Sequence, residues 1–320
     1  MTSKQKILEI MEQKRDDYIS GQYIAKKLEV SRAAVWKNIN LLKEDGYKIE
    51  SKTNKGYRLV KDNDILSEVG IKNSLKDEYK NTKILVLDRV DSTNNYAKKY
   101  AVDTKENLIV LANEQTAGRG RRGRSFASPE KGIYMSMVLR PQIDLKEVYF
   151  STILTVVAVH RALSKFTDER ILVKWVNDLY IGKRKICGIL TELVSNLETM
   201  DVEFLVLGIG INVNSDIKDY PDELSEKVGI FKSKGLNRNQ LIAHIANEVF
   251  ALFENYDKAL ILEEYKSLQL LFGKMINFEQ NGLSKTALAV DITENGELVV
   301  MEKGEKIILN SGDVSVKLGE

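Results

Sequence analysis

The sequence predicts a multidomain α+β protein: an N-terminal winged helix-turn-helix over residues 1–62, a central mixed α/β domain over 63–272, and a small β domain over 273–320. Three observations support this. Amphipathic helices separated by a very short turn come first, alternating strands and helices follow, and beyond Gly273 only strand patterns remain. With 320 residues, 43% of them hydrophobic, the chain has enough apolar surface for several domain cores.

Helix caps and apolar spacing define the helix-turn-helix. Residues 4–14 have one apolar helical face, and Ser20 and Ser31 each precede a further helix as residues of the type that caps helix N-termini. The third helix stops at Gly46, and the tail that follows has two strand patterns around a turn at Asn54–Gly56. Three helices and a hairpin predict a winged helix, whose third helix enters the major groove of DNA.

The charge distribution agrees with DNA binding. Residues 1–60 hold 13 Lys and Arg against 8 Asp and Glu, a net charge of +5, whereas the rest of the chain carries −3. This asymmetry predicts that only the N-terminal part meets a polyanion. A helical protein-interaction module is the alternative interpretation. The predicted DNA contacts are Ser31, Arg32, Trp36, Lys37, Asn40 and Lys43 on the third helix, with Lys52, Lys55 and Arg58 in the wing.

The central and C-terminal parts are predicted from apolar periodicity. Strands are expected at 83–90, 108–115, 133–141, 171–178, 185–194 and 202–214, and helices from Ser92 or Thr93, over 150–166 and over 238–256. The C-terminal strands are expected within 274–280, 286–310 and 314–318, with a hairpin turn at Asn295–Gly296.

A loop with the sequence GRGRRG, residues 118–123, lies between two of these strands. It satisfies the spacing of a dinucleotide-binding fingerprint, but that fingerprint needs its glycines to open a helix, and here a Ser- and Pro-containing segment and a strand follow. A disordered nucleic-acid-binding tail is disfavoured because the loop is embedded between core strands. The guanidinium groups of Arg119, Arg121, Arg122 and Arg124 therefore predict a loop that becomes ordered over a small anion such as a nucleotide phosphate.

Two further segments indicate the same anion. VKWVNDLYIGKRKICG brings Lys174, Trp175, Asn177, Asp178 and Lys185 together around a turn between two strands. A lysine on a buried strand is costly unless it faces a negative ligand. The segment GIGIN has two glycines in an apolar strand, which indicates that something approaches the backbone closely. That group is either another strand or a ligand, and the pattern leaves both open.

Five motifs in this order carry a resemblance to a known family. They are DSTN (91–94), EQTAGRGRRGR (114–124), KWVND (174–178), KICG (185–188) and GIGIN (208–212), and an SRAA recognition-helix motif precedes them. In this combination, which spans essentially the whole chain, the sequence resembles the bifunctional biotin–protein ligases that also repress biotin genes. The resemblance implies a central ligase domain of the class II synthetase-like type and a C-terminal SH3-like β-barrel.

The resemblance also implies a reaction and its partners. The family activates biotin with ATP to biotinyl-5′-AMP and then transfers biotin to a lysine of a biotin carboxyl carrier domain. This chain is accordingly expected to be a biotin–[acetyl-CoA-carboxylase] ligase that uses Mg²⁺ with ATP. Operator DNA with an inverted repeat, and a second copy of the chain in a homodimer when biotinyl-AMP is bound, are the other expected partners.

Site residues follow from the family motifs, position by position. The expected catalytic residues are Lys185, Arg119 and Arg121. The expected biotin contacts are Ser92, Thr93, Asn94, Gln115, Arg119, Gly120, Arg121, Lys185, Gly188, Gly208 and Gly210, where the glycines answer the question about GIGIN in favour of a ligand. The expected nucleotide contacts are Arg119, Arg121, Arg124, Phe126, Asn177, Asp178, Lys185 and Asn212, with Asp178 as the Mg²⁺ ligand. Two positions depart from the family: Val176 replaces the usual proline, and Phe126 stands where many relatives have tryptophan under the adenine.

Composition and motif content limit the other possibilities. One cysteine, Cys187, excludes an internal disulfide framework and a multi-cysteine zinc site, and His160 and His244 are widely separated in helical patterns. There is no run of 18 uninterrupted apolar residues and no signal-peptide pattern, so we expect no membrane span and a cytoplasmic protein.

Three alternative functions remain beside the expected one. A lipoate ligase is disfavoured by the winged helix and the arginine-rich loop. A biotin-sensing repressor without ligase activity is disfavoured because Lys185, Arg119 and Arg121 are all present. A ligase whose winged helix does not act as a repressor stays open.

Overall fold

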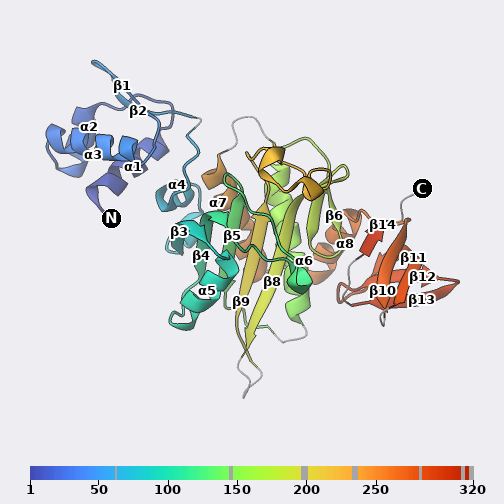
Figure 1. Ribbon diagram of the computed structural model, residues 1–320. Coiled ribbons are helices and arrows are strands. Elements are labelled where there is room, and N and C mark those ends of the chain that lie inside the picture. Colours follow the sequence, from blue (N-terminus) through green and yellow to red (C-terminus); the bar gives the residue numbers. More distant parts are fainter. Residues whose placement is uncertain are drawn as a thin grey trace. The chain divides into compact units, whose positions relative to one another are not determined.

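A computed structural model describes residues 1–61, 63–143, 147–195, 201–232, 237–280, 283–310 and 314–316 (Figure 1). The chain forms two compact units, Met1–Asn81 with Ser233–Asn247 and Thr82–Lys232 with Glu248–Glu320. This division is coarser than the three predicted parts, because the central and C-terminal sheets fall in one unit. The three predicted boundaries stay predictions.

The N-terminal helix-turn-helix and its wing form as predicted. The elements are α1 (Ser3–Gln13), α2 (Gly21–Leu28), α3 (Arg32–Glu44), β1 (Ile49–Lys52) and β2 (Gly56–Leu59). Ser20 Oγ accepts a hydrogen bond from Tyr23 N, and Ser31 Oγ accepts one from Ala34 N, each at 3.1 Å. Both serines are therefore the N-caps that the sequence indicated.

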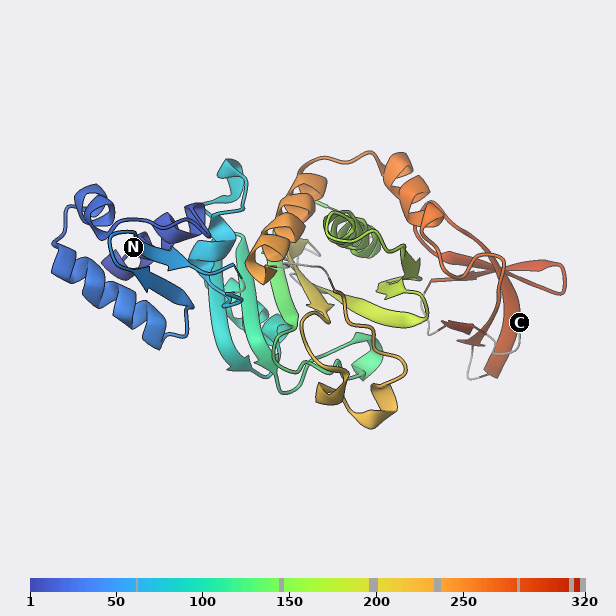
Figure 2. The ribbon, with the colours of Figure 1, turned by 90° about the horizontal axis from the view of Figure 1, so that it is seen from above.

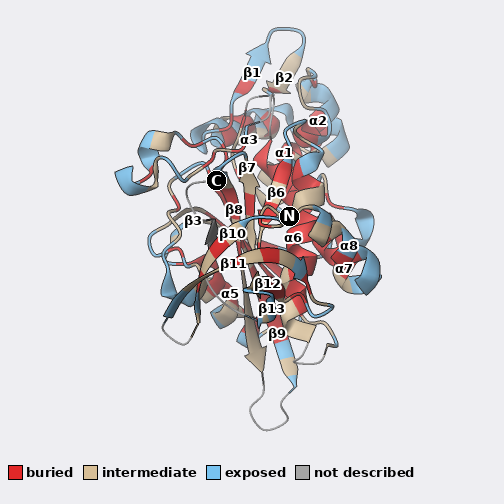
Figure 3. Cartoon of the chain, turned by 90° about the vertical axis from the view of Figure 1, so that its right-hand side faces the viewer, coloured by how far each residue is buried: buried red, intermediate tan, exposed pale blue. Residues whose placement is uncertain are grey.

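The wing is joined to the helices through its backbone. Ile19 and Tyr57 exchange hydrogen bonds of 2.8 and 2.9 Å, so the residue before the N-cap of α2 pairs with β2. Gly56 has a φ of +104°, and a Cβ at that position would collide with the backbone of Ile19, which explains the glycine. Figure 3 shows most of β1 and the hairpin turn exposed and β2 largely intermediate, whereas the helices bury one face each, with Ile24 and Ile39 fully buried.

Residues outside the predicted winged domain complete this unit. They include α4 (Glu68–Lys72), which the sequence analysis did not predict, and the first part of α7 (Arg238–Glu254). The side chain of Asn239 accepts from Ser67 N at 3.0 Å and donates to Ile65 O at 2.8 Å. These bonds hold α7 against the segment before α4.

The second unit is built on a mixed seven-stranded sheet with the order β3-β4-β5-β9-β8-β7-β6. Its strands are β3 (Lys83–Val90), β4 (Leu108–Gln115), β5 (Ile133–Leu139), β6 (Ile171–Lys174), β7 (Asp178–Ile181), β8 (Arg184–Ser195) and β9 (Val202–Ile211). Strands β3 and β4 are parallel, and the other neighbours are antiparallel.

Two strands differ from their predictions. The strand expected over 171–178 ends at Lys174, because the chain turns over residues 175–177 and returns as the additional strand β7. Strand β5 has a period of two in its sequence, yet all of its residues are buried. Both faces of β5 are therefore covered, one of them by α5.

Helices α5 (Thr93–Val102) and α6 (Val148–Ser164) lie on opposite faces of this sheet. Ala97 of α5 packs in one cluster with Val206 of β9. Thr152 of α6 is hydrogen-bonded to Thr191 of β8 at 2.9 Å, and Thr191 pairs with Leu207 of β9. Since neighbouring residues of a strand point to opposite faces, Val206 and Leu207 assign the two helices to different faces.

Helix α8 (Lys258–Ser267), which the sequence analysis did not predict, packs against α6 (Figure 2). Arg161 of α6 and Glu264 of α8 form an ion pair at 2.5 Å. Among the helices of the described ranges, none has the length and apolar character needed to cross a membrane.

The C-terminal strands form a five-stranded antiparallel sheet with the order β13-β12-β11-β10-β14. The strands are β10 (Met275–Gln280), β11 (Leu283–Ile292), β12 (Leu298–Glu302), β13 (Glu305–Leu309) and β14 (Val314–Val316). The predicted turn at Asn295–Gly296 is present, and the oxygen of Gly296 accepts from Trp175 Nε1 at 2.9 Å. The turn between β6 and β7 is thereby fixed to this sheet.

Candidate functional site

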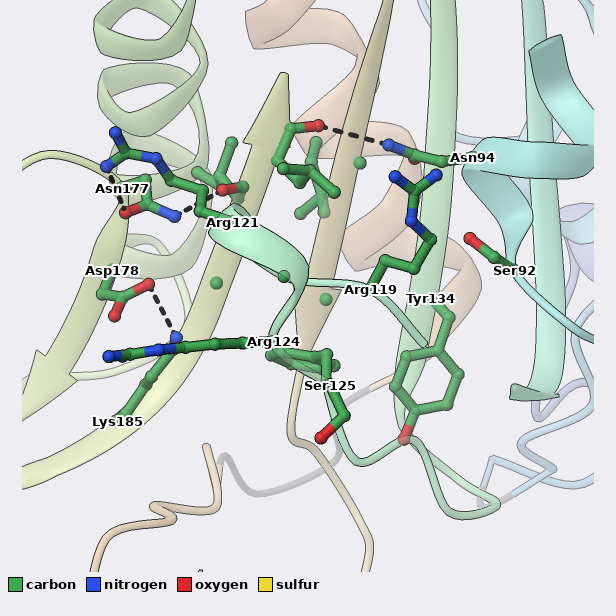
Figure 4. A pocket seen from close by; sticks show the side chains of 18 of the residues that line it. Ser92, Asn94, Arg119, Arg121, Arg124, Ser125, Tyr134, Asn177, Asp178 and Lys185 are labelled. Carbon is green, nitrogen blue, oxygen red and sulfur yellow. Dashed lines mark hydrogen bonds and ion pairs between the residues drawn. The ribbon is translucent and has the colours of Figure 1, made fainter. Parts of the chain in front are cut away.

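A pocket lies on the α5 face of the central sheet, under the GRGRRG loop (Figure 4). Its lining includes every predicted biotin and nucleotide residue except Asn212. Sequence reasoning missed some of the other lining residues, which include Ser125, Tyr134, Met135, Ile189, Leu190, Ile209 and Val314. Segments far apart in the sequence are therefore brought together as the motifs indicated.

The GRGRRG loop folds back on itself as a tight hairpin. Gly120 N donates to Arg124 O at 2.7 Å, and Phe126 N donates to Gly118 O at 2.8 Å. A single 3₁₀ turn, Arg121–Gly123, forms its tip, and no α-helix begins there. The loop thus lacks the helix N-terminus of a dinucleotide site. Figure 4 shows Arg121 pointing towards Asn177 and Arg119 towards Asn94, on opposite sides of the loop.

Lys185 is paired with a carboxylate of the pocket. Its Nζ lies 2.7 Å from Asp178 Oδ1 and 5.8 Å from the centre of the Phe126 ring. The lysine side chain is 31% exposed, so a ligand can reach it. On the far side of Asp178, Asn177 donates to Ile189 O at 2.6 Å and lies 3.5 Å from Arg121 Nη1.

The glycines of β8 and β9 make room for side chains of the pocket. A Cβ at Gly210 would meet the Phe126 ring at 2.6 Å, and a Cβ at Gly188 would meet Lys185 and Phe126 at 3.1 Å. A Cβ at Gly208 would collide with the side chain of Asn94. All three glycines line the pocket, and side chains of the chain already approach them this closely, so their contact with a ligand stays a prediction.

Val176 and Phe126, the two departures from the family motifs, both have contacts in the structure. Val176 is buried, and its oxygen accepts a hydrogen bond from Tyr265 Oη at 2.8 Å. Phe126 meets Tyr134 edge-to-face, with ring centres 6.5 Å apart. Each departure is thus accommodated by packing.

The opposite half of the pocket is a network of uncharged polar groups, in which Thr93, Asn94, Ser128 and Ser136 are buried and Gln115 is partly exposed. Thr93 N donates to Gln115 Oε1 at 2.8 Å, and Gln115 Nε2 donates to Ser128 Oγ at 2.9 Å. Ser136 Oγ lies 2.8 Å from Thr93 Oγ1 and 2.6 Å from Asn94 Oδ1. Such a network suits a polar ligand head that exchanges hydrogen bonds with it.

Glu192 supports this half from beside the pocket, and sequence reasoning missed it. It contacts Asn94, Lys98 and Arg119. A signal existed in the alternation of β8, because Gly188, Leu190 and Glu192 share one face of the strand. A charged residue on the face of β8 that carries Gly188 and Leu190 is a candidate site residue.

Asn212 is not brought into the pocket. It is buried at the end of β9, and its Nδ2 donates to Lys185 O and Gly229 O, both at 3.2 Å. Its backbone accepts from Phe231 N at 2.7 Å. Asn212 is therefore engaged in fixing the backbone of Lys185, and the structure gives its predicted nucleotide contact no support.

The acidic side chain of the pocket suits a metal ion that binds together with a nucleotide. Within the described ranges, no group of three or more His, Cys, Asp and Glu side chains is arranged to hold a metal ion. Asp178 is the one carboxylate among the described lining residues. Since Mg²⁺ is commonly bound by one or two carboxylates together with substrate phosphates and water, Asp178 suits that role.

The predicted DNA-contacting face is mostly exposed. Trp36 is 60% exposed, and Ser31, Arg32, Lys37, Lys43 and Lys55 are exposed, with Asn40 intermediate. Lys43 Nζ donates to Ser51 Oγ at 3.0 Å. Arg58 pairs with Glu50 at 2.6 Å and stacks over Tyr18, and its expected place near the DNA backbone stays a prediction.

Comparison with known proteins gives concordant matches. The Biotin/lipoate A/B protein ligase family matches residues 86–212, an HTH domain matches residues 3–58, and the biotin protein ligase C-terminal domain matches residues 271–317. The bifunctional ligase/repressor BirA of Bacillus subtilis is 38% identical over 249 residues, which cover 76% of each chain. That of Escherichia coli is 28% identical over 313 residues, covering 95% of this chain and 94% of its own. The solved biotin protein ligase from Aquifex aeolicus in complex with biotin and ATP has a TM-score of 0.61 at 25% identity, over 73% of this chain and 98% of its own.

The fold and the pocket first define a class, in which an N-terminal helix-turn-helix precedes a ligase-type sheet and a small C-terminal domain. Identity of 38% over three quarters of the chain then defines the family. The chain belongs to the bifunctional biotin–protein ligases and repressors.

Because Cys187 is buried, the reactivity of its thiol tests the structure around Lys185. The thiol is fully buried beside the pocket, and burial raises its pKa well above the usual range. Because the thiolate is the reactive form, the folded protein should not react with a disulfide reagent such as DTNB at pH 8, whereas the unfolded chain should release one equivalent. Rapid stoichiometric reaction of the folded protein would contradict this arrangement.

Proposed function

We propose that this protein is a biotin–[acetyl-CoA-carboxylase] ligase that also represses transcription of biotin genes. The observation that carries the proposal is the two-part pocket. A neutral hydrogen-bonding half around Thr93 and Gln115 adjoins a cationic half around Lys185 and Arg121. Biotin has the matching parts, since an uncharged ureido head is followed by a chain that ends in a carboxylate.

The reaction needs no nucleophile from the protein. A carboxylate oxygen of biotin attacks the α-phosphorus of ATP, the bond to the bridging oxygen of the β-phosphate breaks, and pyrophosphate leaves. The unprotonated amine of an acceptor lysine on a biotin carboxyl carrier domain then attacks the biotinyl carbonyl carbon, and AMP leaves. Both attacking groups come from substrates, in agreement with the burial of Cys187.

Charge neutralisation is the main contribution of the chain. Two anions, the carboxylate and the α-phosphate, have to approach each other, and Lys185, Arg119 and Arg121 supply compensating charge at that point. Phe126 offers a ring for the adenine, and Arg124 and Asn177 line the same pocket. Mg²⁺ bound with ATP would be held by Asp178 and would neutralise phosphate charge.

The winged helix supplies the repressor function. One copy with a modest positive charge makes few phosphate contacts, so it should bind DNA weakly. A two-fold homodimer would present two α3 helices to an inverted-repeat operator. We infer that biotinyl-AMP links the two functions: by ordering the glycine-rich loop, 118–123, it would favour dimerisation.

The fold types of the central and C-terminal sheets, and the cellular location, follow from the same proposal. We infer that the central sheet is of the class II synthetase type and that the C-terminal sheet is an SH3-like barrel, which the antiparallel order of its five strands supports. Because ATP and operator DNA are both found in the cytoplasm, we place the protein there.

Loss of Lys185 tests the ligase assignment. The Lys185→Ala variant should form biotinyl-AMP about 10²–10³-fold more slowly, the typical cost of removing one group that stabilises developing charge. ATP–pyrophosphate exchange measures this directly. The matched control is Lys183→Ala, an exposed lysine on the turn between β7 and β8, which should stay within about twofold of the wild type. Equal rates for the two variants would refute the role of Lys185.

The coupling between ligand and operator tests the repressor function. Biotinyl-AMP, far more than biotin or ATP alone, should raise both the dimer fraction in sedimentation and the affinity for operator DNA at fixed salt. Arg32→Ala should weaken operator binding and leave dimerisation and adenylate formation unchanged, since Arg32 lies on the exposed face of α3. Equal dimer fractions and operator affinities with and without biotinyl-AMP would mean that the winged helix does not act as a ligand-dependent repressor.

A further inference from the structure

Trp36 on α3 is the most exposed aromatic residue of the described ranges, at 60%. The helix buries a side that includes Val35 and Ile39, and Trp36 lies off that side. Tyr23, the other exposed aromatic residue, has Lys14 Nζ 5.3 Å from its ring centre. An indole left in water costs free energy that contact with an apolar group would recover.

The surroundings of Trp36 are polar and cationic. Residues four and seven apart lie along one side of a helix, so Asn40 and Lys43 follow Trp36 on the same side of α3. Lys43 Nζ donates to Ser51 Oγ of the wing at 3.0 Å. Trp36 therefore lies on the side of α3 that faces the wing. Arg32, one turn before it, and Lys43, two turns after it, are both exposed.

These neighbours indicate which partner covers the indole. A protein that packed against Trp36 with an apolar surface would also have to bury Arg32, Lys37 and Lys43, and removing these charges from water is costly. DNA pairs such cations with its phosphates, and residues 1–60 carry a net charge of +5. The partner that suits both the ring and the charges around it is therefore DNA.

The major groove offers one kind of apolar group to an indole. Base edges there present hydrogen-bond donors and acceptors, and the C5-methyl group of thymine is the one apolar group among them. An indole has a single N–H donor and no acceptor, so it cannot form the paired hydrogen bonds by which Arg or Asn distinguishes a base. Its large ring surface instead gains free energy by covering a methyl group.

We propose that Trp36 is a specificity-determining residue that packs its indole against the C5-methyl group of a thymine in each half-site of the operator. Recognition helices contact base edges with residues near their N-termini, and Trp36 is the fifth residue of α3. The inference rests on the proposed repressor function, to which it adds a base that the helix reads.

The test measures how much the thymine methyl group contributes to operator binding. Wild-type protein with biotinyl-AMP selects a duplex from a pool of random inverted repeats, and deoxyuridine then replaces each thymidine in turn, in both half-sites. Uracil lacks only the methyl group and keeps the hydrogen-bonding edge of thymine. At one thymine position the Kd should rise about fourfold for each half-site, and thus about 15-fold for the dimer, the effect of one methyl group left uncovered in each half-site.

Substitution of Trp36 should remove this effect. In Trp36→Ala, the Kd for the thymine duplex should rise, and the ratio of the uracil Kd to the thymine Kd should fall from about 15 to about 1–2, because no ring remains to cover the methyl group. Trp36→Phe keeps a smaller ring and should retain part of the ratio. The matched control is Lys55→Ala, an exposed cation of the wing, which should weaken binding of both duplexes equally and keep the wild-type ratio.

Non-specific binding separates loss of the ring from loss of the fold. Trp36→Ala retains the cations of α3 and the wing, so its affinity for unrelated duplex DNA, and the salt dependence of that affinity, should equal those of the wild type. A wild-type ratio in Trp36→Ala would overturn the inference, as would a selected duplex in which no thymine can be told from uracil by the wild type. If wild-type protein with biotinyl-AMP selects no sequence, the proposed repressor function itself fails, and the inference fails with it.

Discussion

The pocket depends on holding several like charges close together. Its described lining includes five cations, Lys174, Lys185, Arg119, Arg121 and Arg124, and one carboxylate, Asp178. Asp178 pairs with Lys185, and Glu192 pairs with Arg119. The lining nevertheless has more cations than carboxylates, and this excess of positive charge favours a ligand that brings two anions to one point. The two backbone hydrogen bonds of the loop hairpin, and the pairing of β8 with β7 and β9, hold the backbone that carries these cations in place.

The sheet places the neutral and the cationic groups of the pocket at different points. The polar residues at the start of α5 meet β4 and β5 at one end of the pocket, whereas Lys185 and Asp178 stand where β7 and β8 pair. Phe126 lies against the glycines of β8 and β9 in the cationic half. A head group can thus be selected by hydrogen bonds while the charges act on the opposite end of the same ligand. Glu192 belongs to both halves, since it contacts Asn94 on one side and Arg119 on the other.

Much of this arrangement was predictable from the sequence, and the exceptions have physical reasons. Strands β3 and β4 match their predicted ranges because apolar runs there are bounded by polar residues. Strand β7 was missed because its residues continue an apolar pattern through a turn. The contacts of Glu192 with Asn94 and Lys98 join residues far apart in the sequence, and periodicity within one strand does not reveal such contacts. A motif position or a charge also does not show that a side chain is already bonded, as Asn212 is to Gly229 O and Arg58 to Glu50, and the ligand contacts expected for these two residues stay predictions.

The most direct test of this account is a crystal structure of the protein with biotin and a non-hydrolysable ATP analogue. The account predicts that Lys185 Nζ leaves Asp178 and lies within about 3 Å of oxygens from both the carboxylate and the α-phosphate. It also predicts that the ureido ring donates an N–H to Thr93 Oγ1 or Gln115 Oε1. A structure in which Lys185 stays paired with Asp178, and the carboxylate and α-phosphate meet away from Lys185, would contradict the account.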